Sequence, residues 1–163
     1  MQRRALLTSV GLAMATSSSG CLEFSRDVFD SSSTIGWIGV MNYDTESHQF
    51  EVQVKRDGTL IHESSHTIPE RGDPIIHGTA LDCTWGDTAG KHKIRARIDG
   101  NEWIEQSVDG AIDGTVECVT VRVQYGDQTD AVDRRVSDSL DIFIRENCED
   151  VSEYNGGCEF ANE

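Results

Sequence analysis

Short runs of alternating or β-branched residues recur along most of this chain, with turn-forming residues between them. In the run HQFEVQVKR (His48–Arg56), Phe50, Val52 and Val54 fall on one face of an extended strand, and the residues between them are polar. Because successive side chains point to opposite faces of a strand, this pattern predicts half-buried strands in a sheet. No stretch of the sequence has the length and period of an amphipathic helix. The sequence therefore predicts an all-β protein.

Tight hairpins are expected at Asp57-Gly58 and at Asp99-Gly100-Asn101, because these residues accept the positive φ that two-residue turns require. Seven or eight short strands joined by hairpins and loops suit an antiparallel sandwich of two sheets, of the immunoglobulin-like type. The expected strands are Ile35–Tyr43, His48–Arg56, Thr59–Ile68, Gly78–Trp85, Lys91–Ile98, Glu102–Val108, Thr115–Tyr125 and Ser139–Glu146.

At 163 residues, the chain has room for one domain of ordinary size. We expect an export signal at residues 1–20, a lipid anchor and serine-rich tether at residues 21–34, the sandwich at residues 35–148, and an acidic C-terminal tail at residues 149–163.

The first 20 residues have the layout of an export signal: two arginines, a modestly apolar run, and then small residues. The apolar run is too short for the roughly 20 residues that a helix needs to span a bilayer. Arg3 and Arg4, followed by Ala-Leu-Leu, resemble the twin-arginine signal, which exports folded proteins.

Cys21 follows directly after this signal. Ser19-Gly20-Cys21 resembles the end of a lipobox, in which the cysteine receives a lipid and becomes the first mature residue, although Ser18 stands where lipoboxes usually have a large aliphatic residue. We expect Cys21 to be a lipid anchor, because it ends the signal and stands far from the other cysteines. The alternative is an incidental thiol just past a cleaved signal.

The chain is strongly acidic, with a net charge of −15 and only three lysines. Because Arg3 and Arg4 are the only charged residues among the first 20, the rest of the chain carries −17. Such a surface repels phosphate backbones, which argues against a nucleic-acid partner. It is similar to the acidic surfaces of proteins from salt-loving archaea, where the charge serves solubility.

An acidic cluster that binds a particular cation is the alternative use of this charge. Asp127, Asp130 and Asp133 could hold a hard cation, but they lack the spacing of the 12-residue calcium loop. We interpret this segment as a solvated acidic loop.

His62-Glu63-Ser64-Ser65-His66 matches the H-E-x-x-H motif of zinc proteases. That motif works on a helix, where positions four apart share a face and reach one ion. In the strand expected here, His62 and His66 share a face but stand roughly 13 Å apart, at about 3.3 Å per residue. We therefore expect no metal site, and interpret the motif as polar residues on a solvated strand face.

Other catalytic and cofactor motifs find no match. A blue-copper site needs a histidine after a late cysteine, but no histidine follows His92. The sequence has no Gly-x-Ser-x-Gly nucleophile motif and no phosphate-binding glycine loop. We assign no catalytic residue and no cofactor.

Four cysteines remain after the anchor, and an even number in an exported chain favours two disulfides. Pairing Thr115–Tyr125 with SLDIFIRENC (Ser139–Cys148) so that Cys118 lies opposite Cys148 would set Val121 opposite Arg145 and Val123 opposite Phe143. This register favours the bonds Cys118–Cys148 and Cys83–Cys158. The alternatives are Cys83–Cys118 with Cys148–Cys158, or four cysteines that are reduced or bind a metal.

Trp37, Trp85 and Trp103 fall in expected strands, where packing in the core is the usual role. A tryptophan found exposed would be a candidate for contact with a ligand.

Three segments, Asn42–Pro69, AGKHKIRARIDGNEW (Ala89–Trp103) and CVTVRV (Cys118–Val123), resemble a group of haloarchaeal surface lipoproteins with immunoglobulin-like domains. The resemblance covers most of residues 35–148. It implies a cell-surface location and a fold, and it carries over no catalytic residue.

The function expected from the sequence is that of a lipid-anchored protein at the outer face of the cytoplasmic membrane, with a non-catalytic binding or structural domain. Its partner would be an envelope protein or a glycan. Two alternatives are kept: an accessory or solute-binding component of an envelope complex, and a zinc-dependent hydrolase that uses the His-Glu-Ser-Ser-His motif.

Overall fold

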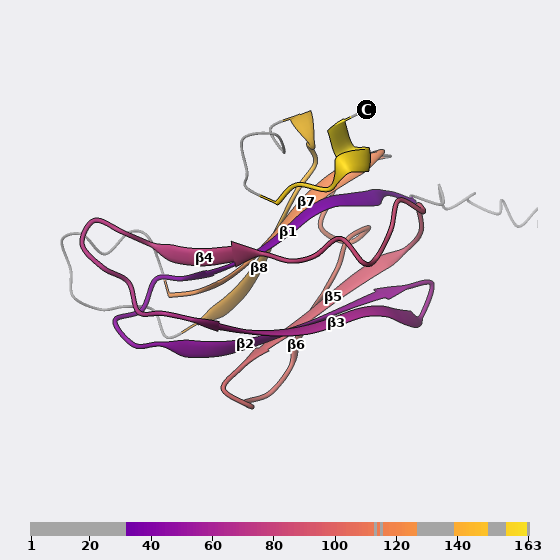
Figure 1. Cartoon of the computed structure of the whole chain (residues 1–163). Helices are drawn as coiled ribbons and strands as arrows, with labels where there is room; N and C mark the ends of the chain where they lie inside the picture. The colour runs from indigo at the N-terminus through magenta and orange to yellow at the C-terminus, as the bar shows by residue number, and fades with distance from the viewer. Residues whose placement is uncertain (1–31, 113, 115, 127–138, 150–155, 163) are drawn as a thin grey trace, which may run out of the picture.

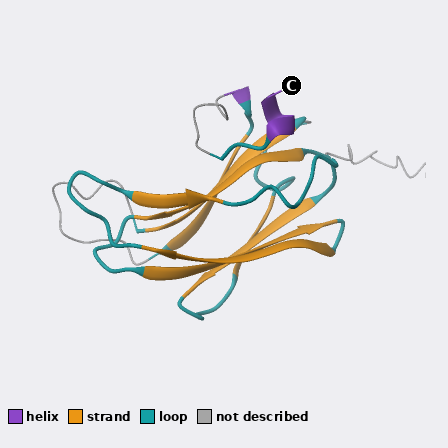
Figure 2. Cartoon of the chain, viewed as in Figure 1, coloured by secondary structure: helices purple, strands orange, loops and turns teal. Residues whose placement is uncertain are grey.

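The chain folds as a sandwich of two four-stranded sheets in the computed structural model, which describes residues 32–112, 114, 116–126, 139–149 and 156–162 (Figures 1 and 2). One sheet has the strand order β4-β1-β7-β8 and is called the β1 sheet here; the other has the order β3-β2-β5-β6 and is called the β2 sheet. The predicted all-β sandwich is confirmed, with one difference. β1 and β7 run parallel, so the β1 sheet is mixed.

The strands are β1 (Thr34–Asn42), β2 (His48–Arg56), β3 (Thr59–Ile68), β4 (His77–Ala80), β5 (His92–Ile98), β6 (Ile104–Ser107), β7 (Cys118–Tyr125) and β8 (Leu140–Arg145), followed by the 3-10 helix η2 (Glu159–Asn162). β2 and β3 have the predicted bounds. β4 and β6 are shorter than predicted, so Trp85 and Trp103 lie in loops and not in strands.

Several predicted features fall outside the described residues. They are the export signal with Arg3 and Arg4, the anchor residue Cys21, and the acidic loop with Asp127, Asp130 and Asp133. No helix within the described ranges is long and apolar enough to cross a bilayer.

Two Asp-Gly turns fix both ends of the pair formed by β2 and β5. Asp57 and Asp99 adopt positive φ values of 49° and 50°, and each is followed by a glycine with positive φ, as predicted for these hairpins. Each aspartate also accepts a backbone N–H of the neighbouring strand region, from Lys91 at 3.0 Å and from Gln49 at 2.8 Å. The turn residues therefore close their own hairpins and also hold the adjacent chain.

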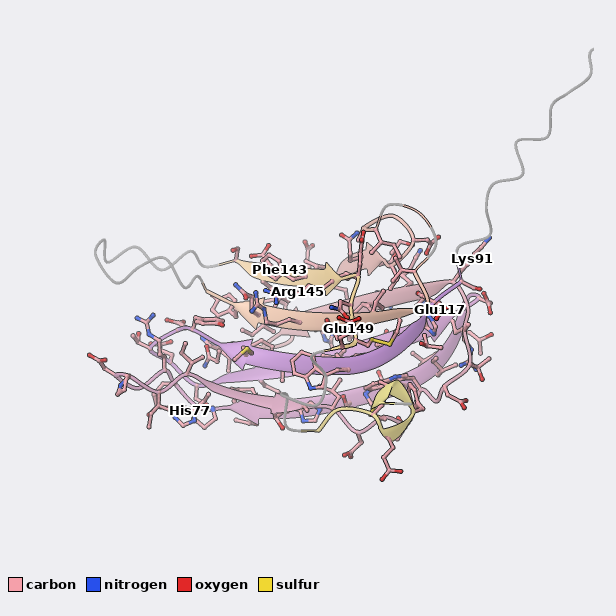
Figure 3. The ribbon with its side chains drawn as sticks, turned by 90° about the horizontal axis from the view of Figure 1, so that it is seen from above. His77, Lys91, Glu117, Phe143, Arg145 and Glu149 are labelled. Atoms are coloured by element: carbon pink, nitrogen blue, oxygen red, sulfur yellow. A yellow bond between two sulfur atoms is a disulfide. The ribbon has the colours of Figure 1, made fainter. Side chains whose placement is uncertain are left out.

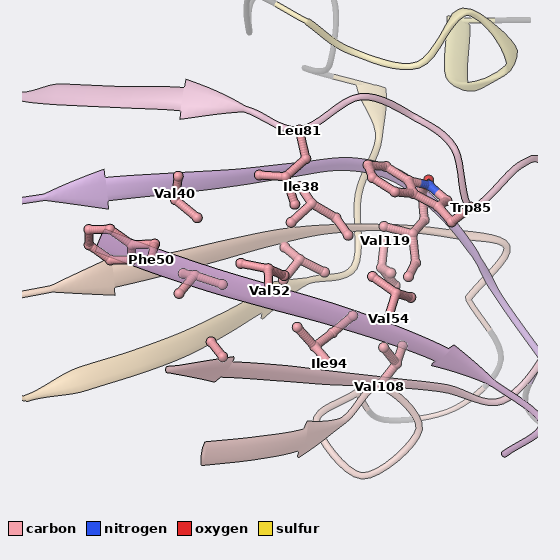
Figure 4. Packing of buried hydrophobic residues seen from close by; sticks show 14 of the residues in the cluster. Ile38, Val40, Phe50, Val52, Val54, Leu81, Trp85, Ile94, Val108 and Val119 are labelled. Atoms are coloured by element: carbon pink, nitrogen blue, oxygen red, sulfur yellow. The ribbon is translucent and has the colours of Figure 1, made fainter. Parts of the chain in front are cut away.

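The core lies between the two sheets and is built from their inward-facing residues (Figure 4). Phe50, Val52 and Val54 of β2 are fully buried and face Ile38 and Val40 of β1. Their alternation with polar residues is the pattern that predicted β2. At about 25 cal/mol per Å² of buried apolar surface, this packing is the main contribution to the free energy of folding.

The register of β7 against β8 differs by one residue from the prediction. The structure pairs Thr120 with Arg145 and Arg122 with Phe143, where the sequence was expected to pair Val121 with Arg145. The predicted register was wrong because it was taken from the cysteines. The hydrophobic pattern determines the register instead: it keeps the valines of β7 in the core and both arginines on the outer face.

The two disulfides join Cys118 to Cys148 and Cys83 to Cys158, each with Cα atoms 5.7 Å apart, which is the pairing that the sequence favoured. Gly36, at a bulge in β1, makes room for the first bond: a Cβ there would lie 2.7 Å from the sulfur of Cys148. Two disulfides suggest an oxidising, extracytoplasmic location.

The C-terminal residues of the described chain pack on the sandwich. The backbone N–H of Cys158 donates to Gly36 O at 3.0 Å, and Cys158 is 1% exposed. Phe160 and Ala161 contact the core. The end of the predicted acidic tail is thus held against the domain.

We expect removal of either disulfide to lower the free energy of unfolding, with the larger loss for Cys83→Ala/Cys158→Ala. That bond closes a separation of 75 residues, against 30 for Cys118–Cys148, and loop-closure entropy then predicts losses of about 4.5 and about 3.5 kcal/mol. Denaturant titration of the two double variants measures the difference. Limited proteolysis is the second measurement: only Cys83→Ala/Cys158→Ala should expose residues 156–161. Equal protection of residues 156–161 in both variants would show that the Cys83–Cys158 bond does not hold this segment on the domain.

Candidate functional site

A groove of about 630 Å³ crosses the outer face of the β1 sheet, on the side away from the core. Its volume is in the range of small-ligand sites, about 300 to 1,000 Å³. The lining residues are Trp37, Val40, Met41, Tyr43, Ile76, Gly78, Thr79, Ala80, Thr120, Val121, Arg122, Phe143, Arg145 and Gly156.

The groove arises from the side chains that the strand register brings into one row. Gly39 of β1 lies between Ala80 of β4 and Arg122 of β7, and Arg122 lies beside Phe143 of β8. Small residues therefore occupy the β4 and β1 end of the row, and large ones the β7 and β8 end. The ring of Trp37 lies over Gly39, where a Cβ would come within 2.1 Å of it. The absence of a side chain at Gly39 lets the tryptophan lie flat on the sheet.

Two arginines and a phenylalanine form the β7 and β8 side of the groove, called the arginine wall here: Arg122, Phe143 and Arg145. The guanidinium of Arg122 lies 5.2 Å from the centre of the Phe143 ring, a cation–π contact. Phe143 is nevertheless 42% exposed. Figure 3, which views this sheet from outside, shows Phe143 and Arg145 close together on β8.

Neither arginine of the wall has an ion pair or a side-chain hydrogen bond among the described residues. The Nε atom of Arg122 is also shielded from solvent and has no hydrogen-bond partner in the described part of the chain. Arg145 is exposed and lies diagonally across the strand pair from Arg122. Asp141 lies on the same face, on the other diagonal from Arg122, but no ion pair joins it to either arginine, in a chain with a net charge of −15.

The outer face of the β2 sheet shows the opposite arrangement. Arg97 pairs with Glu51 at 2.7 Å, and Arg95 pairs with Glu105 at 3.5 Å. Trp103 lies beside both guanidiniums, with ring centres 4.7 and 4.9 Å away. Arg95 and Arg97 are thus each paired with a glutamate of their own face, whereas the two arginines of the arginine wall have no such partner among the described residues.

The tryptophans divide between the core and the outer faces. Trp85 is 2% exposed, and its indole N–H donates to Ile35 O at 2.7 Å, so its predicted core role is confirmed. Trp37 is buried on the outer side of β1, where it lines the groove. Trp103 is half-buried against Arg95 and Arg97.

The histidines of the His-Glu-Ser-Ser-His motif lie on β3, an extended strand, as predicted. His62 pairs with Val54 and His66 with Phe50, so both share the inward face of the sheet. The expectation of a solvated face was wrong for His62, which is 7% exposed. The polar residues of the motif gave no sign that His62 is buried. It is buried because β3 is an edge strand whose inner face meets the loop after β4.

His62 is held as a neutral structural residue. Its ring nitrogens contact Thr84 Oγ1 at 2.5 Å and Ser64 Oγ at 2.9 Å, and its edge meets the Trp85 ring. Burial, and then the nearby charge of His66, lower the pKa of His62. Among the described residues, no group of three or more histidine, cysteine, aspartate or glutamate side chains is arranged to hold a metal.

His48 forms a second polar cluster, between Asp44 and Asp99. Its Nδ1 lies 2.6 Å from Asp99 and its Nε2 lies 2.8 Å from Asp44. Both nitrogens face carboxylates, so both must donate, and the ring is the cation. Asn42 holds the loop that carries Asp44, since its side-chain amide accepts the Asp44 N–H at 3.0 Å.

These contacts shift the pKa values of the cluster. Burial works against the charge on His48, but the hydrogen bonds to Asp44 and Asp99 outweigh it and raise its pKa above 6.5. Burial likewise works against the charges on Asp44 and Asp99, yet their hydrogen bonds, mainly to His48 for the first and to the Gln49 N–H for the second, lower both pKa values below 3.8. The cluster joins the start of β2 to the turn after β5, and its role is structural.

Comparison with known proteins gives no family. A scan of protein-family models finds no match to this chain, and a search of curated proteins finds no similar sequence.

Sequence reasoning missed the arginine wall. A signal was present, because Arg122 interrupts the apolar run CVTVRV at an alternating position, which places it on the outer face of a strand. The groove itself also requires knowing that β1 lies beside β7, and their separation in the sequence hides this.

We expect His48→Gln to destabilise the protein most between about pH 4 and about pH 6.5. The raised pKa of His48 gives stability that is complete below 6.5 and is lost as the pH rises through the folded value. The lowered pKa values of Asp44 and Asp99 give stability that is present above 3.8 and is lost as the pH falls.

Thermal unfolding of both proteins across this range, at fixed salt, measures the difference in midpoint. His77→Gln, at the partly exposed first residue of β4, is the control and should show no such maximum. A difference between His48→Gln and the native protein that is the same at every pH would contradict a charged cluster.

Proposed function

We propose that this protein is a non-catalytic binding domain, held at the outer face of the cytoplasmic membrane by a lipid on Cys21, and that its groove binds an anionic ligand. The observation that carries the proposal is the arginine wall. Its two cations have no acidic partner among the described residues, in a chain with 29 aspartates and glutamates.

The contrast with the β2 sheet supports this reading. Where arginines serve only the fold, as Arg95 and Arg97 do, glutamates neutralise them. An acidic protein has many carboxylates available to pair Arg122 and Arg145 in the same way. Guanidiniums that have no ion pair and lie beside an exposed aromatic ring are common in sites that bind carboxylate or phosphate groups.

The composition of the groove supports binding and not catalysis. Its lining consists of apolar, hydroxyl and guanidinium side chains. These groups recognise a ligand, but they do not exchange protons near neutral pH as a general acid or base must. The location is supported by the two disulfides and by the export layout of the first 21 residues.

We expect the purified Cys21→Ser protein, which carries no lipid of its own, to sediment with cell envelopes prepared from cells that lack the protein. The further changes Arg122→Ala/Arg145→Ala should reduce the bound fraction by about tenfold, as expected when charge-assisted hydrogen bonds are lost. Arg95→Ala/Arg97→Ala is the matched control, since it removes the same charge from the opposite face. Circular dichroism and thermal unfolding check that each variant folds. Equal loss in both variants would show that net charge, and not the groove, determines binding.

The anchor has its own test. We expect Cys21→Ser to release the protein into the medium, because the described residues offer no spanning helix and a thiol at this position is the attachment point for lipid. Mass spectrometry of the mature N-terminus is the direct measurement. An unmodified Cys21, or cleavage elsewhere, would refute the anchor and leave the binding role of the groove intact.

A further inference from the structure

We infer that the ligand of the groove is an acidic saccharide, a short run of sugar rings that carry carboxylates. This assignment rests on the binding role proposed above and names the chemical class that the groove recognises. Three features of the groove lead to it: the strands that form its floor, the spacing of its cations, and the apolar surfaces beside them.

The floor of the groove is the face of two internal strands. β1 pairs with β4 and β7, and β7 pairs with β1 and β8, so their backbone N–H and C=O groups are used within the sheet. An extended peptide usually binds by adding a strand to a sheet edge, where backbone groups are open. A ligand lying over β1 and β7 must instead be recognised by side chains, and the edge strands β4 and β8 form the two sides of the groove.

The cations are placed to hold a carboxylate on a ring. Arg122 is opposite Phe143 in the register, so Arg145 lies on the diagonal, where residues are about 7 to 8 Å apart. The cation–π contact with Phe143 holds the Arg122 guanidinium 5.2 Å from the ring centre. A planar guanidinium held in this way offers two parallel N–H donors, which match the two oxygens of a carboxylate.

The rest of the groove suits the body of a sugar. A sugar ring has an apolar face of C–H groups and a rim of hydroxyls. Phe143 and Trp37 line the groove with flat apolar surface, and Thr120 lines it with a hydroxyl that can donate or accept. The volume, about 630 Å³, accommodates a short oligosaccharide and not a folded domain.

Titration calorimetry with three defined probes tests the assignment on the purified full-length protein. The probes are trigalacturonate, its methyl ester, which has the same rings without charge, and an acetylated, amidated triglutamate, which has the same three carboxylates on a peptide. We expect trigalacturonate to bind, and both matched probes to bind at least about tenfold more weakly. Repeating the titration at about 0.15 M and about 1 M potassium chloride should show weaker binding at high salt.

Variants locate the binding. Arg122→Ala and Arg145→Ala should each weaken trigalacturonate binding by about tenfold, and Arg122→Lys should not restore it, because an ammonium lacks the paired donors. Phe143→Leu, which keeps apolar bulk but loses the flat ring, should weaken it too. Arg95→Ala, on the opposite face, should leave it unchanged, and unfolding midpoints confirm that each variant is folded.

The outcomes separate the two proposals. Equal binding of the methyl ester, or equally tight binding of triglutamate, would overturn the saccharide assignment. The assignment would also be overturned if the protein does not bind trigalacturonate but its sedimentation with envelopes depends on Arg122 and Arg145. In that case the anion-binding role would stand, with a different ligand. If envelope binding is also independent of both arginines, both proposals are wrong.

Discussion

The burial of one face of β7 is the interaction on which the rest of this structure depends. Val119, Val121 and Val123 are fully buried between the sheets, in contact with the core. Because side chains alternate along a strand, this packing fixes the opposite orientation of the residues between them. Arg122 points outward for the same reason that its two neighbours point inward. A slip of one residue would place the guanidinium in the core, at a cost that no pairing on the inner face could offset.

β1 is the strand that this arrangement most directly constrains. It lies between β4 and β7, with the core on one side and the groove on the other. Its sequence reflects both demands. Ile38 and Val40 fill the core, whereas Gly36 and Gly39 leave room on the outer side for a disulfide and for the Trp37 ring. The glycines would weaken an isolated strand. In this structure the disulfide and the Trp37 ring fill the space beside the two glycines and pack β1 against its neighbours.

Local patterns in the sequence were sufficient for most of the fold. The alternation in β2 and the Asp-Gly turns at Asp57 and Asp99 depend on neighbouring residues alone, and both were predicted. The register of β7 with β8 was missed because two cysteines were assumed to lie directly opposite, whereas a disulfide also forms between residues that are offset. The groove was not predictable in this way. It depends on the adjacency of β1 and β7, which are separated by five intervening strands.

The parallel pairing of β1 with β7 also determines how the domain carries mechanical load. Eight register pairs run from Thr34 and Cys118 to Asn42 and Tyr125. Under the proposed anchoring and binding, a pull on the chain before Thr34 that a ligand on β7 and β8 resists is transmitted between β1 and β7. The hydrogen bonds between the two strands lie across the strand direction, so they are sheared together and share the force, instead of being peeled apart one after another. If the anchor and the ligand are as proposed, this strand pair joins the attachment of the domain to its binding face and resists traction between them.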